Sequence, residues 1–197
     1  MEPNYGAPLG APMPADQRRG FREWQPVGGL GIAASVLIGL VALADVLQTI
    51  ADARGLNAQL LLFVVVYYIA LLAAAVVFIV WLWRARSNAE LAAGPQSQRL
   101  GKGWGIGSWI CPVVNLWYPY QYVVDVWRGS RPNREGGDGL VLAWWLTYLA
   151  CNIVARFGGI DDDHSVAIVS CVLDVAAAVA VVLVIRKIGE WQSVARA

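Results

Sequence analysis

Polar and ionisable residues inside long apolar runs are the positions of this sequence best suited to chemistry. Asp45 and Asp174 each interrupt such a run, and Asn152 lies in a third one. An aspartate near the centre of a membrane helix costs about 2.5–3.5 kcal/mol on insertion scales, so its presence needs a reason. We expect these residues to converge, with Gln48 and Arg156, in the outer half of a helix bundle. We favour a network of hydrogen bonds between helices, and a proton or cation path through the two aspartates is the functional alternative.

A second group of polar residues accompanies an aromatic stretch in the middle of the chain. Arg84 and Arg86 follow the second apolar run, and Asp125 and Arg128 lie near the end of the aromatic stretch. An ion pair between Asp125 and one of these arginines would anchor the stretch to its neighbours. Asn115 lies where two prolines break the helical pattern. Its amide can pair backbone groups exposed by the break, which we favour, or contact a ligand or ion.

The residue types that catalysis and metal binding require are scarce. The chain has one histidine and three widely spaced cysteines, with no Cys-x-x-Cys pair and no metal-ligand spacing. No nucleophile–base pair and no glycine-rich phosphate loop is recognisable. The sequence therefore predicts neither an enzyme nor a cofactor or metal site.

Four apolar runs must position these polar residues. Of 197 residues, 58% are hydrophobic and only 15% are charged, against about 25% charged residues in a typical soluble domain. About 20 apolar residues cross the hydrocarbon core of a bilayer as a helix. We therefore predict an all-α membrane protein with four transmembrane helices. The predicted spans are residues 30–50, 60–83, 140–157 and 165–185, within a membrane domain of residues 23–197 that follows a disordered Pro/Gly-rich tail, residues 1–22.

The stretch GWGIGSWICPVVNLWYPYQYVVDVWRG, residues 103–129, is the fifth apolar candidate. Pro112 should end one short helix, and Pro119 suits the first turn of another. Each limb is too short to cross, so residues 104–127 should form a re-entrant hairpin or two helices lying flat in the interface.

The distribution of basic residues decides between a crossing and a return. If the stretch crosses, eight Lys and Arg lie on one side of the membrane and seven on the other. If it returns, all of the 15 except Arg54 and Arg156 lie on the side of both termini. Flanking Lys and Arg favour the cytoplasm, so we predict four spans with both termini cytoplasmic. All ten tryptophans then lie near the cytoplasmic face, where indole rings favour the headgroup level.

The segments WLWRARSNAELAAG, GWGIGSWICPVVNLWYPYQYVVDVWRGS and VIRKIGEWQSVARA resemble an actinobacterial multi-pass membrane family that is catalogued as a domain of unknown function. The resemblance covers roughly residues 30–195. It rests most on a Pro-x-x-Asn-Leu-Trp-x-Pro-Tyr block. The matching positions are Trp81, Arg84 and Asn88, followed by Pro112, Asn115, Leu116, Trp117, Pro119, Tyr120, Asp125 and Trp127. The resemblance implies a four-helix domain in a bacterial membrane and carries over no reaction.

These features together indicate a non-catalytic protein of the bacterial cell membrane that organises partners or lipids at the cytoplasmic leaflet. The expected partners are the bilayer, with anionic lipids near the basic residues, and a second copy or another membrane protein; no nucleic acid is expected. Small residues at 31, 35 and 39 share a helix face and suit close packing, within the chain or in a homo-oligomer. The first alternative is an oligomeric transporter or channel component for ions, protons or small solutes. The second alternative is a membrane-embedded enzyme.

Overall fold

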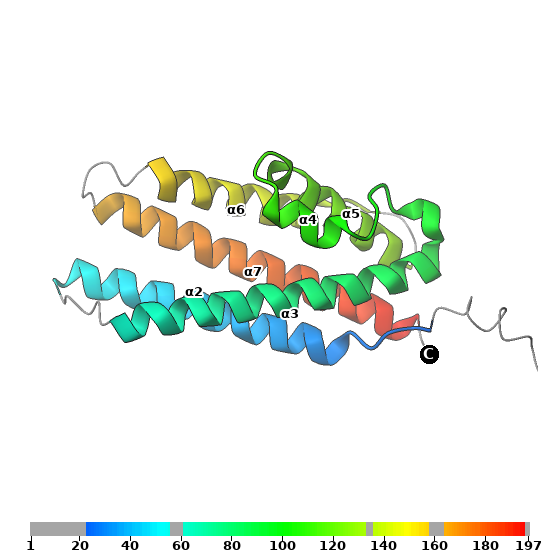
Figure 1. Ribbon diagram of the computed structural model, residues 1–197, viewed down its shortest axis with the longest axis horizontal. Helices are drawn as coiled ribbons and strands as arrows, with labels where there is room; N and C mark the ends of the chain where they lie inside the picture. Colours follow the sequence, from blue (N-terminus) through cyan, green and yellow to red (C-terminus); the bar gives the residue numbers. More distant parts are fainter. Residues whose placement is uncertain (1–22, 56–60, 133–135, 158–163, 196–197) are drawn as a thin grey trace, which may run out of the picture.

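The structure, a computed structural model, describes residues 23–55, 61–132, 136–157 and 164–195. These residues fold into helices and contain no β-strand (Figure 1). The tail predicted for residues 1–22 lies outside the described residues.

Four helices are long and apolar enough to cross a bilayer. They are α2 (Gly28–Ala53), α3 (Leu61–Ala93), α6 (Gly139–Phe157) and α7 (His164–Val194). They confirm the prediction of four long apolar helices. Large apolar side chains cover their outer surfaces, for example Leu62, Leu72 and Val172, which are 72%, 66% and 62% exposed. A soluble protein rarely exposes a continuous apolar surface of this kind, whereas lipid chains cover it without cost.

The helices α3 and α7 continue about ten residues beyond the predicted spans. The spans were predicted to end at the first arginines, Arg84 and Arg186, but a helix that leaves the hydrocarbon need not stop there. With 33 and 31 residues, α3 and α7 are about 50 Å and 46 Å long, which exceeds the thickness of the hydrocarbon core. The end of α3 is marked by Gly94, whose φ of 86° is left-handed, and by Pro95 after it. The segment after Arg84 therefore continues as helix as far as Ala93.

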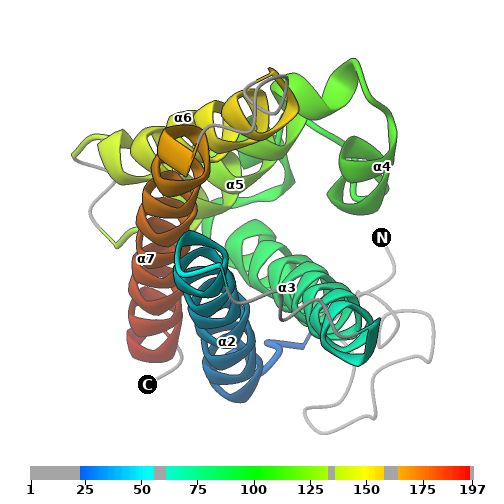
Figure 2. The same cartoon turned by 90° about the vertical axis from the view of Figure 1, so that its left-hand side faces the viewer.

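The four long helices form a row in which α2 packs against both α3 and α7, and α6 packs against α7 (Figure 2). We call the end where α2 and α6 begin and α3 and α7 finish the terminal end, because residues 23 and 195 both lie there (Figure 1). The opposite end is called the far end. In the half nearest the terminal end, α4 (Trp104–Ile110) and α5 (Tyr118–Ser130) fill the space between α3 and α6.

The segment from α4 to α5 enters the bundle and returns to the terminal end. As predicted, α4 stops just before Pro112, and Pro119 lies in the first turn of α5. The short 3-10 helix η2 (Val114–Leu116) forms the tip. There the Leu116 carbonyl accepts a hydrogen bond of 3.1 Å from Trp145 Nε1, in the second turn of α6. The segment is therefore a helical hairpin whose tip packs against the side of α6.

Several of the tryptophans form a core in the terminal half. Trp81, Trp144 and Trp145 are between 0% and 4% exposed, and Trp127 is 5% exposed. Trp109 of the hairpin packs edge-on against Trp145 and Phe78, with ring centroids 6.4 and 6.0 Å apart. These rings fill the space between α3, the hairpin and α6. Sequence composition could not distinguish this buried position from one at the membrane interface.

Candidate functional site

Buried polar side chains gather at the terminal end of the bundle. Asn88 of α3 and Gln192 of α7 are 0% and 1% exposed. The Asn88 amide donates to the Gln25 carbonyl (2.8 Å) and to Gln192 Oε1 (2.9 Å), and accepts from the Gln25 N–H (2.8 Å). The Gln192 amide donates to the Ala85 carbonyl (2.8 Å) and to Ser130 Oγ (2.7 Å). This network joins the segment before α2 to α3, α5 and α7, which makes it a structural clamp.

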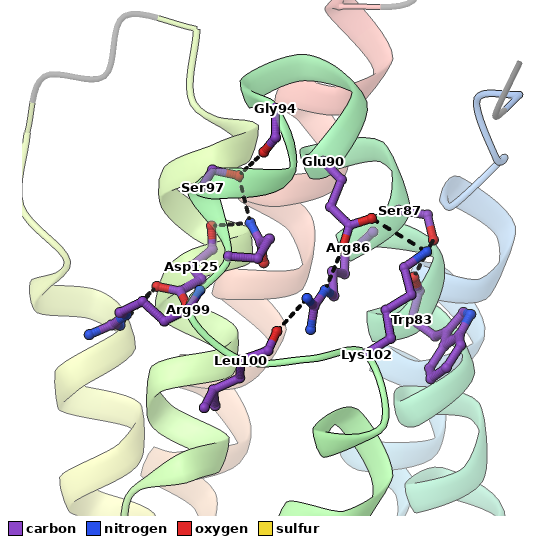
Figure 3. Close-up of polar contacts among 12 residues, drawn as sticks. Trp83, Arg86, Ser87, Glu90, Gly94, Ser97, Arg99, Leu100, Lys102 and Asp125 are labelled. Atoms are coloured by element: carbon purple, nitrogen blue, oxygen red, sulfur yellow. Dashed lines mark hydrogen bonds and ion pairs between the residues drawn. The ribbon is translucent and has the colours of Figure 1, made fainter. Parts of the chain in front are cut away.

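A buried ionic cluster lies between α3 and the connection that precedes α4 (Figure 3). Arg86 donates from Nε to Glu90 Oε1 at 3.0 Å and from Nη2 to the Leu100 carbonyl. Lys102 reaches back to Glu90 (3.5 Å) and donates to Ser87 Oγ (3.1 Å). The side chains of Arg86 and Glu90 are only 4% and 8% exposed. Because a buried ion is costly unless it is paired, these contacts fix the chain between η1 (Pro95–Ser97) and α4 against α3.

Asp125 forms an ion pair with an arginine, as predicted, but the partner is Arg99. The carboxylate accepts from the Arg99 backbone N–H and from Arg99 Nε, both at 2.9 Å. Its own backbone carbonyl accepts from Gln98 Nε2 at 3.1 Å. The predicted pairing with Arg84, Arg86 or Arg128 is wrong, because Asp125 faces the connection after η1, as Figure 3 shows.

The three predicted arginine partners are engaged elsewhere. Arg86 belongs to the ionic cluster, and Arg84 donates to the Pro26 carbonyl at 3.3 Å. Arg128 forms a two-point ion pair with Asp138, just before α6. That hydrogen-bonded pair raises the pKa of Arg128 and lowers the pKa of Asp138, since each group stabilises the charged form of the other.

Tyr122 packs tightly between Arg86 and the helix α4. The Arg86 guanidinium carbon lies 4.7 Å from the centre of its ring. Burial raises the pKa of Tyr122, and the neighbouring Arg86 opposes that shift. A Cβ added to Gly105 would lie 2.7 Å from the Tyr122 hydroxyl and 2.9 Å from Cζ. The close approach of α4 to α5 therefore depends on glycine at position 105.

The predicted convergence of polar residues in the far half is only partly found. Asp45 and Asp174 lie on α2 and α7, which pack against each other. Gln48, however, donates to Asp52 of its own helix at 2.9 Å, and Asn152 donates to the Tyr148 carbonyl of its own helix at 2.8 Å. Within the described parts of the chain, Arg156 forms no ion pair. An interhelical network that includes Gln48, Asn152 and Arg156 is therefore wrong.

The Asn115 side-chain oxygen does not pair with a backbone group of the break, which was the favoured of its two predicted roles. Its backbone N–H donates to the Cys111 carbonyl at 2.8 Å, which holds the turn. Its Oδ1 atom is buried and accepts no hydrogen bond from the described residues.

The residues of the proline–aromatic signature divide into two groups. Trp81, Asn88, Pro119 and Trp127 are buried. At the tip of the hairpin, Pro112 is exposed, and Leu116 and Trp117 are 56% and 43% exposed; Tyr120 is half-buried. The first group builds the terminal half, and the second lies on its surface.

Several central residues were missed by sequence reasoning, namely Glu90, Gln98, Arg99, Lys102, Ser130 and Gln192. The charged ones lie beyond the predicted second span, at the end of α3 and in the connection that follows it. No spacing pattern relates Asn88 to Gln192, which follows 104 positions later.

A cavity of about 270 Å³ lies deeper in the bundle, between α2, α3, α6 and α7. Its walls are mostly apolar, and Asp174 is the one carboxylate among the described residues that line it. Trp109 and Trp144 line it on the side of the hairpin. In the described ranges, no group of three or more His, Cys, Asp or Glu is placed to hold a metal ion.

In a comparison with protein families, the model described as a domain of unknown function, DUF4328, matches residues 42–190. The match covers the hairpin, α3, α6, the part of α2 from residue 42 onward and most of α7. No curated protein and no solved structure matches the chain.

Proposed function

The chain belongs to the DUF4328 family, and we propose that it is a multi-pass protein of the bacterial cell membrane that organises anionic lipids at the cytoplasmic leaflet without catalysing a reaction. In this proposal the terminal end faces the cytoplasm. The protein partner in this proposal is a second copy of the chain or another membrane protein, which would associate with the lipids gathered at the terminal end.

The uneven placement of basic residues carries the proposal. Among the described residues, Arg54 and Arg156 lie at the far end, at the finish of α2 and α6. All other described Lys and Arg lie at the terminal end: Arg84, Arg86, Arg99, Lys102, Arg128, Arg131, Arg186 and Lys187. This asymmetry supports a cytoplasmic terminal end, and each base close to an anionic leaflet attracts it by about 1 kcal/mol.

The bases at the terminal end divide between structural and surface roles. Arg86 is buried within the ionic cluster, but the side chains of Arg99, Arg128 and Lys187 are 52%, 56% and 51% exposed. The clamp and the hairpin hold these exposed bases on a rigid frame close to the ends of the membrane helices. Such a frame is suited to attracting lipid headgroups and needs no chemical step.

The pairing of the acids supports a role without catalysis. At the terminal end Glu90 is paired with Arg86, Asp125 with Arg99, and Asp138 with Arg128. A carboxylate held in this way is a weak general base, because its negative charge is already stabilised.

Lipid analysis of the purified protein tests the proposal. We expect wild-type protein reconstituted in equal parts of phosphatidylglycerol and phosphatidylcholine to retain more phosphatidylglycerol than the bulk bilayer contains. A variant with Arg128→Gln and Lys187→Gln should lose part of this enrichment, and Arg54→Gln, at the far end, should keep it. Equal retention of the two lipids by the wild type would refute the proposal.

Thiol labelling in intact cells tests the orientation. In a chain whose native cysteines are replaced by Ala, Arg54→Cys should react with a membrane-impermeant maleimide, and Ser193→Cys should react only after lysis. The reverse pattern would place the terminal end outside and remove the basis for the leaflet assignment.

Transport is the second candidate, and the cavity that contains Asp174 is the observation in its favour. A path through one monomer must also pass the packed aromatic residues of the terminal half, where Trp144 and Trp145 are 4% and 3% exposed. A transporter would therefore need the hairpin to move or several copies to assemble.

A further inference from the structure

A groove on the outer surface of the bundle runs between α2 and α7 in the terminal half. Its volume is about 530 Å³. Gly28, Gly31 and Ser35 line it on α2, and Ile185, Arg186 and Gly189 line it on α7. Small side chains on both helices leave this space open, since a Cβ added to Gly28 or Gly189 would meet nothing within 4 Å.

The groove is polar at one end and apolar at the other. Gly28, Arg186, Gly189 and Ser193 lie toward the terminal end, and Ile32, Val36 and Val182 lie deeper in the bundle. This gradient follows the membrane normal in the same sense as a lipid of that leaflet, with its headgroup at the surface and its chain inside.

Unsatisfied donors face the polar end. No described side chain caps α2, and its first turn contains no acidic residue. The first N–H groups of a helix have no acceptor within the helix and carry a partial positive charge. Arg186 is exposed and forms no hydrogen bond or ion pair with a described residue. Glu190 also lines the groove, but it is 66% exposed and lies 3.6 Å from Lys187, which offsets its charge.

A buried donor at the base of the groove is a separate observation. Trp81 is 0% exposed, and its Nε1 atom has no hydrogen-bond partner among the described residues. This atom lies beside Gly31, where an added Cβ would be 3.2 Å from it and 3.2 Å from Ile185 Cγ2. A buried N–H without an acceptor costs about 1–3 kcal/mol, so an acceptor supplied by a ligand would be favourable here.

We propose that this groove is a specific site for one anionic phospholipid of the leaflet at the terminal end. Arg186 and the first N–H groups of α2 bind the phosphate. An ester carbonyl accepts from Trp81 Nε1, and an acyl chain lies along Ile32, Val36 and Val182. A helix of a second copy would fit the small residues, but it would leave the phosphate-binding donors without a partner. The inference rests on the proposed function and adds to it a defined site and stoichiometry.

The test is native mass spectrometry of the detergent-solubilised full chain with phosphatidylglycerol or phosphatidylcholine of identical acyl chains. Wild-type protein should retain one phosphatidylglycerol in preference to phosphatidylcholine. Gly189→Leu projects a side chain into the groove at a position where an added Cβ would meet nothing within 4 Å, and Arg186→Gln removes the phosphate ligand. Each should weaken phosphatidylglycerol binding roughly tenfold, the scale expected for one charged hydrogen bond.

Gly39→Leu is the matched control, because Gly39 also has nothing within 4 Å of an added Cβ and lies on α2 outside the groove. Its lipid binding should equal that of the wild type, and the melting temperatures of all variants should be similar. A wild-type preference for phosphatidylglycerol that neither Gly189→Leu nor Arg186→Gln reduces would overturn this site and leave the proposed function standing. No preference in the wild type would reject both. A dimer that Gly189→Leu converts to monomer with unchanged lipid binding would assign the groove to a second copy.

Discussion

The clamp around Asn88 predicts a large loss of stability when its side chain is shortened. Asn88→Ala removes three hydrogen bonds and leaves Gln192 Oε1, in a side chain that is 1% exposed, without a donor. An unsatisfied buried carbonyl costs about 1–3 kcal/mol, and each lost bond to partly buried Gln25 costs about 1 kcal/mol. We therefore expect the free energy of unfolding to fall by about 3–5 kcal/mol. The measurement is reversible unfolding in mixed micelles of dodecyl maltoside and sodium dodecyl sulfate.

Asn152→Ala is the control for this prediction. The Asn152 amide donates to a carbonyl of its own helix, so its removal should cost under about 1 kcal/mol. Asn88→Asp separates the loss of hydrogen bonds from the loss of side-chain volume. It preserves the shape of the side chain but places a carboxylate oxygen, in place of the amide donor, against the Gln25 and Gln192 oxygens. It should be at least as destabilising as Asn88→Ala. If Asn88→Ala costs no more than Asn152→Ala, or if Asn88→Asp matches the wild type, the clamp does not hold the terminal end together.

Two further predictions concern the hairpin and its connection to α6. Gly105→Ala places a methyl group 2.7 Å from the Tyr122 hydroxyl, so we expect the free energy of unfolding to fall by about 1–3 kcal/mol in the same assay. Gly107→Ala is the control, because its added Cβ would be 3.6 Å from the nearest atom and should change the stability little. Equal effects of the two substitutions would contradict the close packing of α4 against α5. The lowered pKa of Asp138 means that its pair with Arg128 stabilises the fold above the ordinary carboxyl pKa of 3.8, and that this contribution is lost as the pH falls through the lowered value. Asp138→Asn should therefore be less stable than the wild type at pH 7, and the difference should shrink below about pH 4; a difference that does not depend on pH would refute the ion pair.

Local physical chemistry explains what the sequence could predict. Each apolar run must satisfy its own backbone in lipid, so its length and composition alone indicate a helix. Proline has no N–H and disrupts the preceding turn, so the breaks at Pro112 and Pro119 followed from the residues themselves. The hairpin in turn followed from these breaks and from the distribution of Lys and Arg.

Contacts between distant segments could not be predicted in this way. The partner of Asp125 depends on how the connection after η1 folds back, and Arg99 in that connection competes with three arginines of similar chemistry. The burial of Trp144 and Trp145 depends on the hairpin that packs against them. Tryptophan suits both a core and a membrane interface, so composition alone could not assign these rings.

The cavity beside Asp174 is where the transport alternative can be decided. A path for protons or cations needs polar groups or water on both sides of that aspartate. On the side of the terminal end it meets Phe78, Trp109 and Trp144, which line the same cavity. Moving an ion past such apolar groups without water is costly, so we expect liposomes that contain the wild-type protein to leak protons and potassium ions at the rate of protein-free liposomes. Asp174→Asn should leave that rate unchanged. Trp109→Ala removes the hairpin side chain from the cavity wall, so its leak rate is the most sensitive one to compare with that of the wild type. A wild-type flux above background that Asp174→Asn abolishes would show that the hairpin opens, and it would replace the lipid-organising role with transport.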